Sequence, residues 1–176
     1  MLTPSTRSAN LLIVSENHLR GDEMSNGELI ENLNKAMSLE LSAVIQYTQH
    51  SFLISGTDRE VFKDFFRDMA EEAQDHADFL GDKIVALGGV PTVEPAMIRQ
   101  SVELKKMLRQ GLELERAALE AYMEAWRSCG DKDLPTKFWL EGHIADEQLH
   151  IEELERLTSD RVAEITSDKI VLKEVS

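Results

Sequence analysis

The sequence predicts an all-α protein, a four-helix bundle with one long crossover, and three observations lead to this fold class. Apolar residues recur in steps of three and four along four stretches of the 176-residue chain, which is the spacing of one helix face. Only four Pro and nine Gly interrupt the chain, so long helices are permitted and a sandwich of many strands is disfavoured. The link between the second and third stretches is much longer than the other two links.

The chain divides into one domain and two flanking segments. Residues 1–24 show no sustained apolar period, and we expect a loose N-terminal extension there. With 42% hydrophobic residues, the chain is large enough for one sizeable core, which we assign to a bundle at residues 25–158. The period fades beyond it, so residues 159–176 are expected to form a C-terminal tail or a short helix.

The four helices follow one another along this domain. The first is expected from Glu28 to about Ser55, where residues 56–58 interrupt the pattern. Gly88 and Gly89 end the second helix. The apolar stripes run from Ile30 to Tyr47, from Phe62 to Leu87, from Leu104 to Trp126 and from Leu140 to Leu157.

The lengths of the links predict the topology. The first two helices are joined by a few residues, as are the last two, so each pair is expected to form an antiparallel hairpin. The link at residues 89–101 contains Pro91 and Pro95, and at about 3.3 Å per extended residue it reaches about 40 Å, the length of a helix of about 27 residues. It can therefore run the length of the bundle and leave the second and third helices parallel.

Charge and composition limit the function classes. The 19 Lys and Arg against 33 Asp and Glu give a formal charge of −14, which opposes nucleic-acid binding and favours cations. No apolar run approaches the roughly 18 residues that span a bilayer, so no membrane partner is expected. The single Cys129 cannot form an intramolecular disulfide, as is typical of a reducing compartment, and we expect a cytoplasmic protein.

Polar groups interrupt each apolar stripe at positions where the period calls for an apolar residue. Unpaired buried charges are costly and are rarely retained without a compensating ion or partner. Four carboxylates and two imidazoles that face one core therefore imply a bound cation. The candidate ligands are Glu40, Glu72, His76, Glu115, Glu147 and His150.

These groups are expected at one height in the bundle. Glu40 lies as far before the first expected turn as Glu72 lies after it, and Glu115 and Glu147 flank the second turn at the same separation. At a rise of about 1.5 Å per residue, each carboxylate lies about 24 Å from its turn. The separation of Glu40 from Glu115 equals that of Glu72 from Glu147, so the two halves repeat and a twofold centre with two metals is predicted.

A Glu-x-x-His match alone is a weak sign, because a chain of this length with 21 Glu and five His is expected to contain about 0.6 such pairs by chance. A solvated acidic helix face explains a single match better. The agreement of four stripes, two hairpins and one crossover is far more specific, and it favours a metal site over a structural polar layer.

Short motifs in the helices form a set. They are ELxAxxQYxxH at residues 40–50, HAD at 76–78, LGGVP at 87–91, LELE at 112–115 and ExxHI at 147–151. The set resembles the ferritin-like superfamily and, within it, the bacterioferritins. The chain also looks like haem-free mini-ferritins that pair a bacterioferritin-like site with a smaller shell.

The resemblance implies a di-iron centre held by five of the candidate ligands. Glu40 and Glu115 are then terminal carboxylate ligands. His76 and His150 are imidazole ligands, and Glu147 is a bridging carboxylate.

Two departures from the bacterioferritin pattern affect this assignment. The family's second-helix Glu stands three residues before His76, at a position occupied here by Ala73, whereas Glu72 stands four before it. The repeat between the two halves nevertheless makes Glu72 the counterpart of Glu147, and we predict that Glu72 is a ligand. The haem-ligating Met of bacterioferritins falls at Gln74, so haem is not expected.

Other aromatic side chains lie near the expected site. Tyr47 follows Glu40 by seven residues on the same face, and it either contacts the metals as a hydrogen-bond or radical partner or packs in the core. His50 and His143 lie one to three turns from the site, and they either orient the ligands or are ordinary hydrogen-bonded helix residues.

The function expected from the resemblance is iron oxidation for storage and detoxification. The di-iron centre is expected to act as a ferroxidase that oxidises Fe²⁺ with O2 or H2O2, with the product stored inside a hollow homo-oligomer of 12 or 24 chains. One alternative is a non-storage di-metal oxidase or peroxidase of the same fold. Another is a DNA-coating mini-ferritin, against which the charge of −14 argues.

Overall fold

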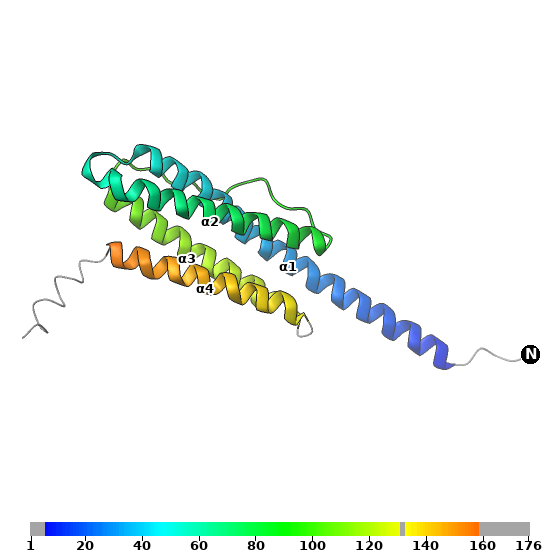
Figure 1. Ribbon diagram of the computed structural model, residues 1–176. Helices are drawn as coiled ribbons and strands as arrows, with labels where there is room; N and C mark the ends of the chain where they lie inside the picture. Colours follow the sequence, from blue (N-terminus) through cyan, green and yellow to red (C-terminus); the bar gives the residue numbers. More distant parts are fainter. Residues whose placement is uncertain (1–5, 131–132, 159–176) are drawn as a thin grey trace, which may run out of the picture.

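The computed structural model describes residues 6–130 and 133–158, with side chains from residue 26 on. The long helices pack side by side (Figure 1). The described part of the chain contains no strand, which confirms the all-α prediction. The elements are α1 (Thr6–Leu53), the short 3-10 helix η1 (Gly56–Asp58), α2 (Arg59–Ala86), α3 (Leu104–Ser128) and α4 (Leu134–Thr158).

The helices form two hairpins, α1–α2 and α3–α4. These hairpins pack together mainly through α1, which contacts both α2 and α3. Gly56 closes the first hairpin with a φ of 71°, a left-handed conformation that favours glycine. The guanidinium of Arg59 donates to the carbonyl oxygen of Ile54 at 2.9 Å and thereby caps the end of α1. Packing of α3 against α4 forms the second hairpin, whose turn includes residues 131–132, outside the described residues.

The crossover at residues 87–103 lies along α1 (Figure 1). Its partners on α1 advance along the helix as the crossover itself advances, so the chain runs back beside α1 before α3 begins. The crossover therefore leaves α2 and α3 parallel, as predicted from its length. The hydrogen bonds join Asn34 Nδ2 to Val90 O (3.1 Å), Thr92 N to Asn34 Oδ1 (2.7 Å), Ala96 N to Ser38 O (2.8 Å) and Arg99 N to Gln46 Oε1 (2.8 Å).

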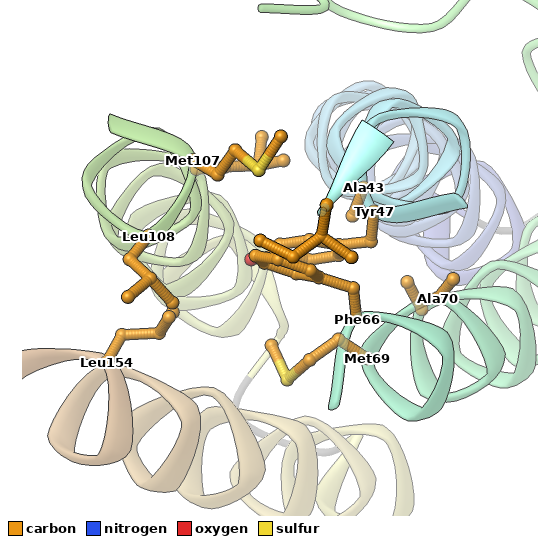
Figure 2. Packing of buried hydrophobic residues seen from close by; sticks show 11 residues of the cluster. Ala43, Tyr47, Phe66, Met69, Ala70, Met107, Leu108 and Leu154 are labelled. Carbon is orange, nitrogen blue, oxygen red and sulfur yellow. The ribbon is translucent and has the colours of Figure 1, made fainter. Parts of the chain in front are cut away.

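Two clusters of apolar side chains fill the bundle, with a polar layer between them. Figure 2 shows the first cluster, in which the rings of Tyr47 and Phe66 lie at the centre and Leu154 reaches in from α4. Burial of such side chains is the main stabilising contribution to a helical bundle. The second cluster includes Leu33, Ala36, Leu80, Ile84, Ala121, Tyr122 and Leu140.

The N-terminal part of α1 differs from the prediction. A loose extension was expected at residues 1–24, whereas α1 is helical from Thr6 and continues well beyond the rest of the bundle (Figure 1). An apolar period marks the residues that form a core, so its absence from a segment does not exclude a helix there. Pro4 is the last proline before Pro91, and Gly21 within the helix costs only about 1 kcal/mol relative to Ala.

Two further expectations concern the C-terminal segment and membrane-spanning helices. The C-terminal tail or short helix expected at residues 159–176 lies outside the described residues. None of the described helices combines the length and apolarity that a bilayer crossing requires.

Candidate metal centre

A polar layer separates the two apolar clusters at the depth where the carboxylates were expected. Glu40 of α1, Glu115 of α3 and Glu147 of α4 are 3%, 5% and 1% exposed. His76 of α2 is also buried, and His150 of α4 is partly buried. All four helices thus contribute titratable groups to one layer, and carboxylates buried this closely require a compensating positive charge or shared protons.

The layer contains two groups of three potential ligands. In the first, His76 Nδ1 lies 3.1 Å from Glu147 Oε1 and 3.4 Å from Glu40 Oε1. In the second, His150 Nδ1 lies 3.4 Å from Glu115 Oε2, and Glu147 is again the third member. The ligand atoms within each group lie within 4.8 Å of one another, so one ion between them can reach all three. Glu147 belongs to both groups, so it would be the carboxylate shared by two metal ions if both groups were occupied.

Glu147 also shows that the layer fits metal ions. Its Oε2 is buried and has no hydrogen-bond partner in the described structure. Burial raises the pKa of the Glu147 carboxyl well above its usual range, and the charges of Glu40 and Glu115 raise it further. A metal ion would satisfy the unpartnered oxygen and replace the proton that this pKa retains. Carboxylate oxygens and imidazole nitrogens are a donor set that suits iron.

The other ligands carry opposing electrostatic effects. Burial opposes ionisation of Glu115, but hydrogen bonds with His150, Glu147 and Tyr47 outweigh it and lower the pKa of the carboxyl. Burial also lowers the pKa of both ligand imidazoles. The hydrogen bond and charge of Glu40 at His76, and of Glu115 at His150, outweigh burial and raise both pKa values. Without metal, the layer therefore holds protons that bound cations would displace.

Two tyrosines bind the terminal carboxylates from opposite hairpins. Tyr47 Oη donates a short hydrogen bond to Glu115 Oε1, and Tyr122 Oη donates to Glu40 Oε1 at 2.8 Å. Burial and then the neighbouring carboxylates raise the pKa of both phenols, so they stay protonated and act as donors. Sequence reasoning placed Tyr122 on an apolar stripe and missed this contact. The signal was available, because Tyr122 follows Tyr47 by the same interval that separates Glu115 from Glu40.

A cavity of about 530 Å³ lies between α2 and α4 beside the polar layer. The imidazoles of both candidate ligands, His76 and His150, line it, together with the carboxylates of Glu72, Asp75 and Asp146. Glu72 and Asp146 are exposed, so the cavity connects the ligands with solvent. Its acidic walls favour the entry of cations.

The family of the chain follows from comparison with known proteins. The family model for the ferritin-like domain matches residues 30–161, most of the chain. The chain belongs to the ferritin-like family. Bacterioferritin from Brucella melitensis is 38% identical over 135 residues, which cover 73% of this chain and 81% of the relative. The nutrient stress-induced DNA-binding protein of a Synechococcus strain is 28% identical over 128 residues, which cover 65% of this chain and 72% of the relative.

Solved structures of ferritin-like proteins share the bundle. A ferritin-like, diiron-carboxylate protein from Bacillus anthracis has a TM-score of 0.74 at 34% identity, covering 77% of this chain and 98% of that chain. A dodecameric thioferritin from Bacteroides fragilis, described as bacterioferritin-related, has a TM-score of 0.70 at 25% identity, covering 85% of this chain and 98% of that one. These likenesses confirm the four-helix ferritin-like fold and the resemblance to bacterioferritins.

In this ferritin-like protein, Glu72 differs from its counterpart Glu147. The Glu72 side chain is 55% exposed, and its Oε2 lies 2.8 Å from His150 Nε2, on the opposite side of the ring from Glu115. The residue that faces the core is Ala73, which is 5% exposed. Successive helix residues differ by about 100° in direction, so a core-facing Ala73 turns Glu72 toward the cavity.

His50 and His143, the two histidines near the layer that were not assigned as ligands, are buried and neutral. Burial lowers the pKa of His50 and of His143 to about 4. The His50 ring lies 5.2 Å from the Phe66 ring, and neither of its nitrogens has a hydrogen-bond partner among the described residues. The His143 ring stacks on Tyr122, with centroids 5.4 Å apart. His50 therefore packs like an apolar side chain, whereas His143 contacts a residue that binds Glu40.

Proposed function

We propose that this protein is a ferroxidase that oxidises Fe²⁺ at a di-iron centre and stores the product. One observation carries the proposal. Glu147 is shared by two buried groups, each of which also contains one Glu and one His from other positions in the layer. The proposed iron ligands are Glu40, His76, Glu115, Glu147 and His150, with Glu72 at the cavity side of His150.

The donor set supports iron redox chemistry. When bound, the two irons supply the electrons that reduce O2 or H2O2 as Fe²⁺ becomes Fe³⁺. Imidazole nitrogens suit Fe²⁺ and carboxylate oxygens suit the harder Fe³⁺. Because Glu147 lies between both groups, one carboxylate can compensate charge at either position during the change of oxidation state.

The surrounding residues orient the ligands and exclude water. Tyr47 and Tyr122 each donate a hydrogen bond to one carboxylate, which restricts rotation of Glu115 and Glu40. Outer contacts of this kind typically change metal affinity or activity about 10- to 100-fold. The two apolar clusters close the layer on both sides, so the cavity between α2 and α4 is the proposed path for Fe²⁺.

Stopped-flow oxidation of Fe²⁺ by Glu147→Gln tests the centre. This change removes the shared charge while nearly preserving shape, and we expect the rapid phase to be lost with helix content retained by circular dichroism. Glu153→Gln is the matched control, because Glu153 is an exposed carboxylate on the same helix. Oxidation by Glu147→Gln at the wild-type rate would contradict the proposal.

Storage is proposed to occur in a homo-oligomer of 12 or 24 chains. The bacterioferritin-related relative from Bacteroides fragilis is dodecameric, which supports an assembly of this kind. Native mass measured with retained iron tests storage, and a monomer or dimer without retained iron would instead favour a non-storage di-metal oxidase or peroxidase. One relative is named as DNA-binding, but the charge of −14 opposes a nucleic-acid partner here.

Haem is not part of the proposed function. Gln74, at the position of the haem-ligating Met, is exposed and donates to Asp78 Oδ1 at 2.8 Å. We expect purified protein mixed with haem to show no stoichiometric Soret band after gel filtration. A band that survives and is lost on changing another Met, such as Met69, would contradict this expectation.

A further inference from the structure

A third group of potential ligands lies beside the two groups that share Glu147. It consists of His76, His143 and Asp146, whose ligand atoms lie within 4.8 Å of one another. His143 lies one helical turn before Glu147 on α4, and Asp146 directly precedes Glu147. All three residues line the cavity between α2 and α4, whereas Glu40 and Glu115 of the proposed centre do not.

One ring nitrogen of His143 is buried at this position without a hydrogen-bond partner among the described residues. This nitrogen is Nδ1, and His143 as a whole is 8% exposed. Its ring stacks on Tyr122 and meets the Trp139 ring edge-on, with centroids 4.6 Å apart. A buried imidazole nitrogen without a partner is costly, so its position at the wall of an acidic cavity points to a ligand.

His76 can serve two positions at once as an imidazolate. Its Nδ1 faces Glu40 and Glu147, and its second ring nitrogen, Nε2, can bind another ion when metal binding displaces the remaining ring proton to solvent. The ring centroids of His76 and His143 are 4.7 Å apart at an interplanar angle of 86°. The two imidazoles therefore lie close enough for one ion to contact both.

We propose that His76, His143 and Asp146 form a third metal site, specific for first-row divalent cations, at the inner wall of this cavity. Two imidazoles and one carboxylate form a donor set typical of such ions, with remaining positions open to water. Glu72 and Asp75 line the same cavity, and its lining residues include no Lys or Arg. This site adds to the proposed di-iron centre, and its existence does not depend on ferroxidase activity.

Cobalt binding to the full-length, metal-free protein tests the site. Co²⁺ is titrated into wild-type protein and variants, with stoichiometry from equilibrium dialysis and the visible absorption of bound Co²⁺ as a second readout. His143→Phe keeps an aromatic ring beside Tyr122 but removes both nitrogens, and Asp146→Asn preserves shape. We expect each variant to bind one Co²⁺ per chain fewer than wild type and to lose the corresponding absorption. Asp75→Asn, a charge removed from the same cavity outside the group, is expected to retain wild-type stoichiometry.

The outcomes separate this site from the proposed centre. Unchanged Co²⁺ stoichiometry in both His143→Phe and Asp146→Asn would overturn the third site, even if Glu147→Gln loses bound metal. A loss of one ion in these variants, alongside unchanged metal binding in Glu147→Gln, would support the third site and contradict the di-iron centre. Equal losses in Asp75→Asn and Asp146→Asn would show general attraction by an acidic cavity and would also overturn the site.

Discussion

The α1–α2 hairpin and the α3–α4 hairpin place the same side chains at corresponding positions. Glu40 and Tyr47 on α1 recur as Glu115 and Tyr122 on α3, with the same interval between the members of each pair. Each tyrosine donates its hydrogen bond to the carboxylate of the other hairpin. The repeated residues therefore do more than duplicate a site, because they also connect the two halves across the core.

The hairpins differ at their second helices. Glu147 of α4 is buried and shared by two ligand groups, whereas Glu72 of α2 is exposed and contacts His150. The buried position on α2 belongs to Ala73. The proposed centre thus has a twofold arrangement of Glu40 and Glu115, but only one carboxylate, Glu147, belongs to both ligand groups.

The largest expected effect separates Glu147 from Glu72. We expect Glu147→Gln to lower the rate of Fe²⁺ oxidation by more than about 100-fold and Glu72→Gln by only about tenfold, the lower end of the 10- to 100-fold range of outer contacts. Stopped-flow absorbance measures both. A metal-loaded crystal structure decides the role of Glu72: as a ligand, its carboxylate lies about 2.0–2.2 Å from a metal. Equal rate losses in the two variants would instead support the prediction that Glu72 is a ligand equivalent to Glu147.

The second prediction concerns the tyrosine–carboxylate hydrogen bonds, which both hairpins contain. Tyr47→Phe and Tyr122→Phe each remove one hydrogen bond to a buried carboxylate, and we expect each to destabilise the metal-free protein by about 1.5–3 kcal/mol. Thermal unfolding measures the two losses. The chain has only two Tyr, so the double variant removes both contacts. A large loss for one tyrosine and none for the other would show that the halves are unequal here as well.

Acidification tests a residue that only one half contains. His50 corresponds in the repeat to Ala125, and its pKa is lowered from 6.5 to about 4. The unfolded state then binds more protons, so the stability contributed by neutral His50 is present above pH 6.5 and is lost as the pH falls towards 4. We expect His50→Leu to reduce the loss of stability over this window by about 2 kcal/mol, measured by unfolding of the metal-free protein.

Three other histidines also change the pH dependence of stability and determine the background of that measurement. His143 contributes to the pH dependence of stability in the same direction as His50, because its pKa is also lowered to about 4. The raised pKa values of His76 and His150 have the opposite sign, since their contribution is present below the unfolded pKa and is lost as the pH rises. An identical acid response in His50→Leu and wild type would contradict the role assigned to His50.

The smallest expected effect concerns the space beside Tyr47. A Cβ at Gly111 would lie 2.9 Å from Tyr47 Oη and 3.1 Å from its Cε1, whereas the repeat places Ala36 at the corresponding position of the other half. We expect Gly111→Ala to destabilise the protein by about 1 kcal/mol, because crowding of the core outweighs the gain in helix propensity. Thermal unfolding measures the change, and Gly142→Ala is the control, since its Cβ would meet nothing within 4 Å.

Helical spacing predicted the direction of each helix and the height of the polar residues along the bundle axis. The hairpins, the crossover and the height of Glu40, Glu115 and Glu147 follow from counting residues at a constant rise. The same counting placed Glu72 in the layer, because a one-residue difference in register hardly changes height but rotates a side chain by about 100°. Choosing between Ala73 and Glu72 requires the packing of α2, which only the structure provides.

Other features were missed because apolar periodicity measures packing and little else. The N-terminal part of α1 extends beyond the rest of the bundle (Figure 1), and no apolar period marks it. Tyr122 has both an apolar ring and a polar hydroxyl, and the stripe recorded only the ring. Asp146 is exposed next to a proposed ligand, and sequence alone does not distinguish it from a solvated acid.

The crossover bound along α1 joins two hairpins that each form from residues close in the sequence. Contacts within a hairpin are local and form quickly, whereas α1 and α3 must meet across a long separation. By holding both hairpins in one chain, the crossover keeps their local concentration high, so their docking becomes an intramolecular step. A chain cut between Val90 and Arg99 would therefore still form its helices, but the two halves would assemble at a rate that depends on protein concentration.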